Sequence, residues 1–305
     1  MFRGEGIGFG RGFEMATAAR SLAETGTFGD PFSPFLTGPT AAIPPLYPLF
    51  LAALIKVFRQ PASAVFVASF ASVVINAFVA SALPRLSAVF YGAALPGIFA
   101  GLLWMFSVQL MPQWDVSYTV SGIILFCLLI SNAADRKTGG LRQYAAGVTA
   151  GLLALLNPLA LLICALWTGF LFQHRRPGLD YALRTAAKLV FAAALCVLPW
   201  LWRNYLLWHA VVVRTNFGMT VYVSNNDCAQ SSISRSGDNG CFQAYHPVGS
   251  ESEAALLRKL GEVEYDRLRT ADALRWIRDN PVRFQELTRD RIVEFWFPEN
   301  VVSRY

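Results

Sequence analysis

The sequence predicts an all-α polytopic membrane protein, with about six transmembrane helices between an external loop and an external helical tail. Hydrophobic residues make up 54% of the 305 residues and charged residues only 15%, which is too apolar for an ordinary soluble domain. Between Ser63 and Ala134 the only charged residues are Arg85 and Asp115, and 143–173 contains none. Segments that leave water must satisfy their own backbone, which favours helices.

The first region, 1–60, is expected to be an external loop with a juxtamembrane helix. Its glycine-rich start contains Glu14, and an apolar helix is predicted over Ile43–Phe58. Prolines open that helix and Lys56 and Arg59 close it, so a position in the membrane interface is favoured over a full crossing. The first forty residues hold neither a signal peptide nor a span. We therefore expect an upstream helix, and a chain truncated at its start.

The second region, 61–205, is predicted to be the transmembrane bundle. About 20 residues are needed to cross a bilayer, and the fourth and fifth segments below are shorter, so one broken hairpin is an alternative for that pair. The six predicted spans are Pro61–Leu83, Ala88–Leu110, Val116–Ser131, Tyr144–Leu156, Leu159–Phe172 and Leu183–Trp202.

Basic residues predict the orientation of the bundle. They cluster in two short loops and at the adjoining helix ends, which by the positive-inside rule face the cytoplasm. The opposite ends, with the region of Glu14 and everything after Trp202, are then external. The basic residues are Arg136, Lys137, Arg142, His174, Arg175, Arg176, Arg184 and Lys188.

The third region, 206–305, is predicted to be an external tail. Alternation over Val211–Val223 predicts a short extended pair, and a polar loop follows at 225–249. Apolar spacing predicts a helix over Glu251–Asn280, ended by Pro281, and a second amphipathic helix over Val282–Phe297. These helices either lie on a membrane surface or form a hairpin that packs on itself. A further span is expected to begin after Phe297.

The polar loop contains Cys228 and Cys241, which form a disulfide if the loop faces an oxidising compartment and are otherwise two free thiols. We expect no metal site, because the three histidines are scattered and no Cys-x-x-Cys occurs. No cofactor and no nucleic-acid partner are expected either. Topology and anionic membrane lipids account for the net charge of +6.

Several short motifs of the chain are similar to those of one enzyme family. They are Glu14-Met15, Ala19-Arg20-Ser21-Leu22, Gly26-Thr27-Phe28, Asp30-Pro31-Phe32, Thr37-Gly38-Pro39-Thr40-Ala41, Pro44-Pro45-Leu46-Tyr47-Pro48, Leu155-Leu156-Asn157-Pro158, Pro199 to Tyr205, and Arg214 to Gly218. The motifs of the first region resemble the first external loop of the C-type glycosyltransferases, polytopic enzymes related to the dolichyl-phosphate-mannose protein mannosyltransferases and to the bacterial transferase that adds aminoarabinose to lipid A. The later motifs resemble bacterial members as well.

The resemblance implies a multi-pass enzyme of the bacterial inner membrane that transfers a sugar from a polyprenyl-phosphate donor, with inversion, at the extracytoplasmic face. Its acceptor is a protein, a lipid or a glycan. An acid in the first external loop serves such enzymes as general base, and Glu14 is the candidate, since a hydroxyl nucleophile is weak until a positioned carboxylate takes its proton. The alternatives are a non-catalytic or truncated relative and a lipid-handling or transport protein.

Cations are needed for the departing lipid phosphate, and the candidates are Arg203 and Arg214. Asn204, Tyr205 and Asn216 are candidates for hydrogen bonds to phosphate or sugar. Arg203 is alternatively a residue that extends to the lipid headgroups beside its tryptophan neighbours.

Three acids have a plainer interpretation beside the functional one. Glu14 is alternatively a solvated acid near a helix start, and Asp30 before Pro31 is a common turn arrangement. Asp115 is expected either to line a cavity between helices or to be an anchor at a span boundary.

Overall fold

The computed structural model describes residues 14–59, 61–107, 115–133 and 139–297. Within these ranges the chain is all-helical, and the one β-type pairing is an isolated bridge between Gly29 and Pro39. The chain divides into two compact units. Unit 1 comprises 1–27 and 44–213, and unit 2 comprises 28–43 and 214–305. The first region, expected as an external loop with a juxtamembrane helix, thus contributes residues to both units.

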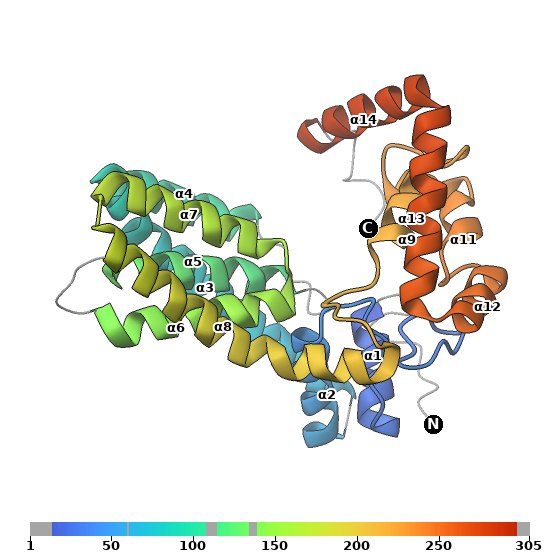
Figure 1. Cartoon of the computed structure of the whole chain (residues 1–305), viewed down its shortest axis with the longest axis horizontal. Coiled ribbons are helices and arrows are strands. Elements are labelled where there is room, and N and C mark those ends of the chain that lie inside the picture. The colour runs from blue at the N-terminus through green and yellow to red at the C-terminus, as the bar shows by residue number, and fades with distance from the viewer. Residues whose placement is uncertain (1–13, 60, 108–114, 134–138, 298–305) are drawn as a thin grey trace. The chain divides into compact units, whose positions relative to one another are not determined.

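Unit 1 is a helical bundle preceded by two shorter helices. Six helices, α3 to α8, lie side by side, and α1 packs on α2 beside them (Figure 1). Two of these helices are long and apolar enough to cross a membrane, over Ser63–Tyr91 and Leu179–Trp208. The helices are α1 Glu14–Thr25, α2 Leu46–Phe58, α3 Pro61–Tyr91, α4 Leu95–Ser107, α5 Val116–Ala133, α6 Gly139–Leu156, α7 Ala160–Arg175 and α8 Leu179–Trp208.

Glycines allow the closest approach between helices of the bundle. A Cβ at Gly147 of α6 would lie 2.6 Å from the Leu189 carbonyl oxygen of α8, and one at Gly151 would lie 2.8 Å from that of Ala193. On α4, a Cβ at Gly101 would lie 2.7 Å from the Ala80 carbonyl oxygen of α3. Small residues four apart let backbones meet in this way in membrane proteins.

The first predicted span ends too early. A turn was expected between Leu83 and Ala88, but α3 continues through Pro84 to Tyr91, and the turn lies at 92–94. Proline removes the hydrogen bond to the Ala80 carbonyl and crowds that group. The same carbonyl faces Gly101 of α4, so the continued helix is packed closely against α4 at this turn.

The bounds of the other predicted spans differ less from those of the observed helices. The last helix of the bundle begins at Leu179, four residues before the predicted span, and runs to Trp208. The structure keeps α6 and α7 as two helices separated by Asn157 and Pro158. The end of the second predicted span, at Leu110, lies outside the described residues, as do Arg136 and Lys137.

Unit 2 is built from six helices and the segment 28–43. The extended pair predicted over Val211–Val223 is wrong, because α9 occupies 217–224 and no strand forms there. The single helix predicted over Glu251–Asn280 is two helices, because Gly261 has φ +77° and ends α12. The helices are α9 Phe217–Ser224, α10 Ile233–Asp238, α11 Cys241–Tyr245, α12 Glu251–Leu260, α13 Glu262–Asp279 and α14 Pro281–Trp296.

A buried carboxylate attaches the segment 28–43 to the rest of unit 2. Glu262, the first residue of α13, is 3% exposed. One of its oxygens accepts from the Thr40 hydroxyl at 2.5 Å, and the other accepts from the Ala41 N–H at 2.7 Å and the Thr215 hydroxyl at 2.6 Å. Phe32 and Ala42 add apolar contact by packing in one cluster with Tyr265.

Candidate functional site

Glu14 is the first residue of α1 and is half-buried. The neighbouring Met15 packs with Ala16 and Ala19 in a cluster that includes Tyr47 of α2 and Leu156 at the end of α6. The cluster also contains Ala68, near the start of α3. Glu14 therefore lies at the end of the bundle where α3 begins and α6 ends.

An aromatic group with a buried acid occupies the same end. The rings of Tyr47, Phe50 and Tyr118 are in mutual contact, and the Tyr47 and Tyr118 centroids lie 5.0 Å apart. Asp115 precedes α5, is 6% exposed and accepts from the Thr119 hydroxyl at 3.2 Å. Burial, the Tyr118 hydroxyl and the Asp115 carboxylate together raise the pKa of Tyr47, so Asp115 lies near that phenol.

Asp115 is thus inside the protein at a helix start. Of the two interpretations offered for it, the contacts fit a group that lines the interior, because an interfacial anchor would be exposed. The hydroxyl oxygen of Tyr118 is buried as well, and the Ser72 side chain lies within its reach.

The register between α6 and α8 places Arg203 near this end as well. Gly147 faces Leu189 and Gly151 faces Ala193, so the two helices run in parallel and α8 extends beyond Leu156. The Arg203 guanidinium lies 4.6 Å from the centre of the Trp200 ring and 5.4 Å from that of Trp208. Such cation–π contacts hold the charge at the helix end, which fits both a phosphate ligand and a headgroup contact.

The side chains of the two residues after Arg203 differ in how accessible they are to a ligand. Asn204 is fully buried, accepts from Arg203 at 2.9 Å and donates to the Val212 carbonyl at 2.8 Å. Its amide therefore fixes the segment that leaves α8. Tyr205 is 43% exposed and its ring stacks against Trp202, so its hydroxyl remains the more accessible of the two predicted contacts.

The other predicted site residues belong to unit 2. Asp30 has φ +52° and accepts from the Gly38 N–H at 2.8 Å, which is the turn interpretation. Arg214 donates to the Ala42 carbonyl at 2.9 Å. Asn216 precedes α9, and its side chain makes no capping bond. Glu14, Asp115 and Arg203 are thus gathered in unit 1, whereas Asp30, Arg214 and Asn216 lie in unit 2.

The cysteines of the polar loop form a disulfide, Cys228–Cys241, with a Cα–Cα distance of 5.7 Å. Cys127, Cys164 and Cys196 are free. Over the ranges that the structure describes, no group of three His, Cys, Asp or Glu side chains is placed to hold a metal ion.

Sequence reasoning missed the buried charges of unit 2. Besides Glu262, the Arg269 guanidinium pairs with Glu253 at 2.6 Å and lies 4.4 Å from the centre of the Tyr222 ring. Tyr265 donates to the same carboxylate at 2.8 Å. Acids and arginines spaced along a helix look solvated in a sequence, and no local pattern indicates that these are buried.

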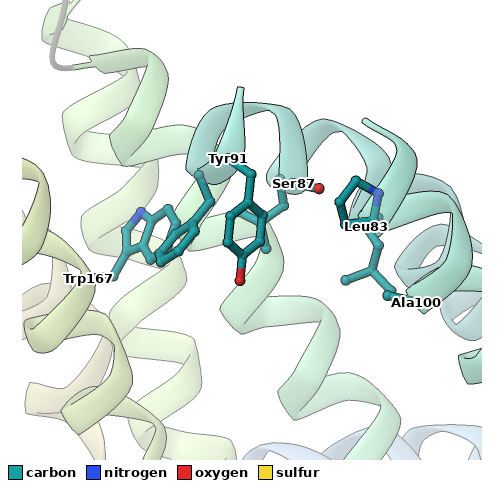
Figure 2. A pocket seen from close by; sticks show the side chains of 9 residues that line it. Leu83, Ser87, Tyr91, Ala100 and Trp167 are labelled. Atoms are coloured by element: carbon teal, nitrogen blue, oxygen red, sulfur yellow. The ribbon is translucent and has the colours of Figure 1, made fainter. Parts of the chain in front are cut away.

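An apolar cavity of about 340 Å³ opens at the other end of α3. Figure 2 shows Trp167 of α7 beside Tyr91, with Leu83, Ser87 and Ala100 around the remainder. No charged side chain lines it, and the Ser87 hydroxyl donates to the Ala93 carbonyl at 2.7 Å. The cavity is suited to hydrocarbon and offers no group for proton transfer.

No protein-family model, curated protein or solved structure matches the chain.

Proposed function

We propose that the chain is a membrane glycosyltransferase that moves a sugar from a polyprenyl-phosphate donor to an acceptor at the extracytoplasmic face, with Glu14 as general base. The observation that carries the proposal is the gathering of Glu14, Asp115 and Arg203 at one end of one bundle. A half-buried carboxylate and a cation at a membrane boundary are the groups that deprotonation of a hydroxyl and departure of a phosphate require. The buried acid Asp115 lies at the same end.

The surface of the bundle supports its placement in a bilayer. Large apolar side chains stand exposed along α3, α4, α7 and α8, which is unfavourable in water over so large a continuous area. We infer that all six helices cross, with α5 and α6 between the two longer ones, α4 packed on α3, and α7 packed on α5 and α6. Examples are Phe66, Phe70, Phe99, Leu103, Leu162, Leu166, Phe191 and Leu195, each at least 57% exposed.

The orientation has two supports that do not depend on each other. Basic residues lie at the end of the bundle where α6 and α8 begin and α7 ends, opposite Glu14, and the positive-inside rule assigns that end to the cytoplasm. The Cys228–Cys241 disulfide belongs to a chain segment that follows α8. Disulfides persist in oxidising compartments, so unit 2 is extracytoplasmic.

Within this proposal Glu14 takes the proton of the acceptor hydroxyl as that oxygen attacks the sugar carbon. The bond from that carbon to the phosphate oxygen breaks at the same time, and the polyprenyl phosphate leaves with its negative charge. Arg203 stabilises this charge, and its flanking tryptophans keep the guanidinium at the membrane boundary.

The test is transfer from radiolabelled polyprenyl-phosphate sugars in membranes that contain the chain. Glu14→Gln should lower turnover by roughly 10²- to 10⁴-fold, the contribution of a general base, while membrane insertion stays intact. The matched control is Glu24→Gln, which removes an exposed acid from the same helix. Near-normal turnover of the Glu14 variant beside an active wild type would refute the base assignment.

A further inference from the structure

A polar cleft in unit 2 lies between the disulfide-closed loop and α14. It consists of two cavities of about 250 and 260 Å³ that share Gln230 and Ser231 in their walls. Arg235 and Arg283 line the first cavity, and Arg291 lines the second. We call the combined space the arginine–serine cleft.

The carboxylates of the cleft already have cationic partners. Glu294 accepts from the Ser231 hydroxyl and lies 3.4 Å from the Arg235 guanidinium. Asp290 pairs with Arg289 at 3.0 Å. These two acids are therefore neutralised within the protein.

The guanidinium of Arg291 has uncharged partners instead. Among the described residues its guanidinium donates to the Asn225 side chain at 3.2 Å and to the Ser224 carbonyl, both of them uncharged groups. Three of its five N–H donors remain. Burial and the nearby Arg283 lower the pKa of Arg291, as expected for a cation without a counter-ion in the described part of the chain.

Two further groups add donors. Ser236 is 5% exposed, and its oxygen accepts from the Gln230 N–H at 3.0 Å, so its hydroxyl proton is left to donate. Arg283 makes two long contacts, each at 3.4 Å, to Glu286 and to the Ala229 carbonyl. The groups on this side of the cleft that can still form hydrogen bonds are thus donors, and the two arginines among them are positively charged.

We propose that the arginine–serine cleft binds a phosphate-type oxyanion, held by the guanidinium groups of Arg283 and Arg291 and by the Ser236 hydroxyl. A tetrahedral phosphate has only acceptors, and guanidinium groups match it with paired donors. The site is separate from the proposed sugar transfer, because Glu14 and Arg203 belong to unit 1. The phosphate belongs either to a soluble molecule or to a lipid headgroup, and the experiment separates these sources.

The experiment is a calorimetric titration of the purified full chain with inorganic phosphate, in nanodiscs of phosphatidylcholine. Wild type should bind saturably, and Arg291→Gln should bind at least tenfold more weakly, since a charge-assisted pair is lost. The matched control, Arg278→Gln, removes one exposed positive charge from α13 outside the cleft and should bind as wild type does. Absence of saturable binding, or equal affinity of the Arg291 variant and wild type, would overturn the proposal.

Arg291 also holds the backbone at Ser224, so its replacement risks local unfolding. Arg283→Gln disturbs only long contacts and should lower the affinity by a similar factor. Protection of the Cys228–Cys241 disulfide from reduction and alkylation reports whether the loop stays folded. If the loop stays folded in the Arg283 variant and the affinity is unchanged, the proposal also fails.

The source of the phosphate follows from repeating the titration in nanodiscs that contain phosphatidylglycerol. Weaker phosphate binding there, in wild type but not in Arg283→Gln, identifies a lipid headgroup as the occupant. Unchanged phosphate affinity identifies a soluble phosphate.

Discussion

Replacement of Glu262 by glutamine should loosen unit 2 selectively. The carboxylate is buried and accepts three hydrogen bonds from residues far apart in the chain, two of them in the segment 28–43. Glutamine keeps the size and one acceptor oxygen, which can still take the Ala41 N–H and the Thr215 hydroxyl. The other position becomes an NH₂ group, and the Thr40 hydroxyl must turn to accept from it.

The magnitude follows from the change in bond strength. Hydrogen bonds to charged groups contribute about 1.5–3 kcal/mol each and neutral ones about 1 kcal/mol. Three hydrogen bonds are weakened, and the smaller cost of burying an uncharged amide offsets part of that loss. The free energy of unfolding of Glu262→Gln is therefore expected to be about 2 kcal/mol lower than that of wild type. Glu262→Ala leaves the donors unpaired as well, at about 1–3 kcal/mol for each buried group, and should lose about 4 kcal/mol or more.

The assay is pulse proteolysis of the full chain across a urea series, scored on fragments from residues 214–297. Glu264→Gln is the control, because Glu264 lies two residues along α13, is 59% exposed and pairs with Arg267 at the surface. It should stay within about 0.5 kcal/mol of wild type. The reasoning is wrong if Glu262→Gln unfolds at the same urea concentration as this control.

Three further predictions follow from the packing, a titrating group and the disulfide. Gly147→Ala should weaken the α6–α8 contact, because its Cβ would meet the backbone of α8, whereas Gly169→Ala, with nothing within 4 Å, should be tolerated; thermal unfolding in detergent compares the two. Desolvation raises the pKa of Asp266 despite its backbone hydrogen bonds, so its charge costs stability above that pKa. Asp266→Asn should therefore be more stable than wild type at pH 7, and urea unfolding should show this advantage shrinking as the pH falls toward the ordinary value of about 3.9. Reduction of Cys228–Cys241, which closes a loop of sequence separation 13, should cost about 3 kcal/mol in the same urea assay, and an unchanged midpoint would contradict it.

The helical bundle was predictable because its signals are local. Apolar length identified the helices from α3 to α8, although several of their bounds differ from the predicted ones. The end of α3 shows the limit of local rules, because the first span was predicted to end at Leu83, whereas the helix continues through Pro84 to Tyr91. Whether a proline ends a helix depends on what packs against it, which a sequence does not state.

Unit 2 was harder to predict because its organisation depends on distant pairs. Glu262 begins a helix, where an acid is expected on dipole grounds alone, yet its partners include Thr40 and Ala41, more than 200 residues earlier. No periodicity links such positions. The break at Gly261 was missed for a different reason, since helical spacing continues on both sides and only the backbone conformation reveals it.

Two residues of the Thr37-Gly38-Pro39-Thr40 motif have a structural explanation in unit 2. Gly38 has φ +82°, a conformation suited to glycine, and donates its N–H to Asp30. Thr40 then reaches Glu262. These contacts account for Gly38 and Thr40 of the Thr-Gly-Pro-Thr sequence without any substrate. The contacts of Gly38 and Thr40 therefore belong to the folding of this loop. The proposed chemistry depends instead on Glu14, Asp115 and Arg203, whose replacement should change turnover without loosening unit 2.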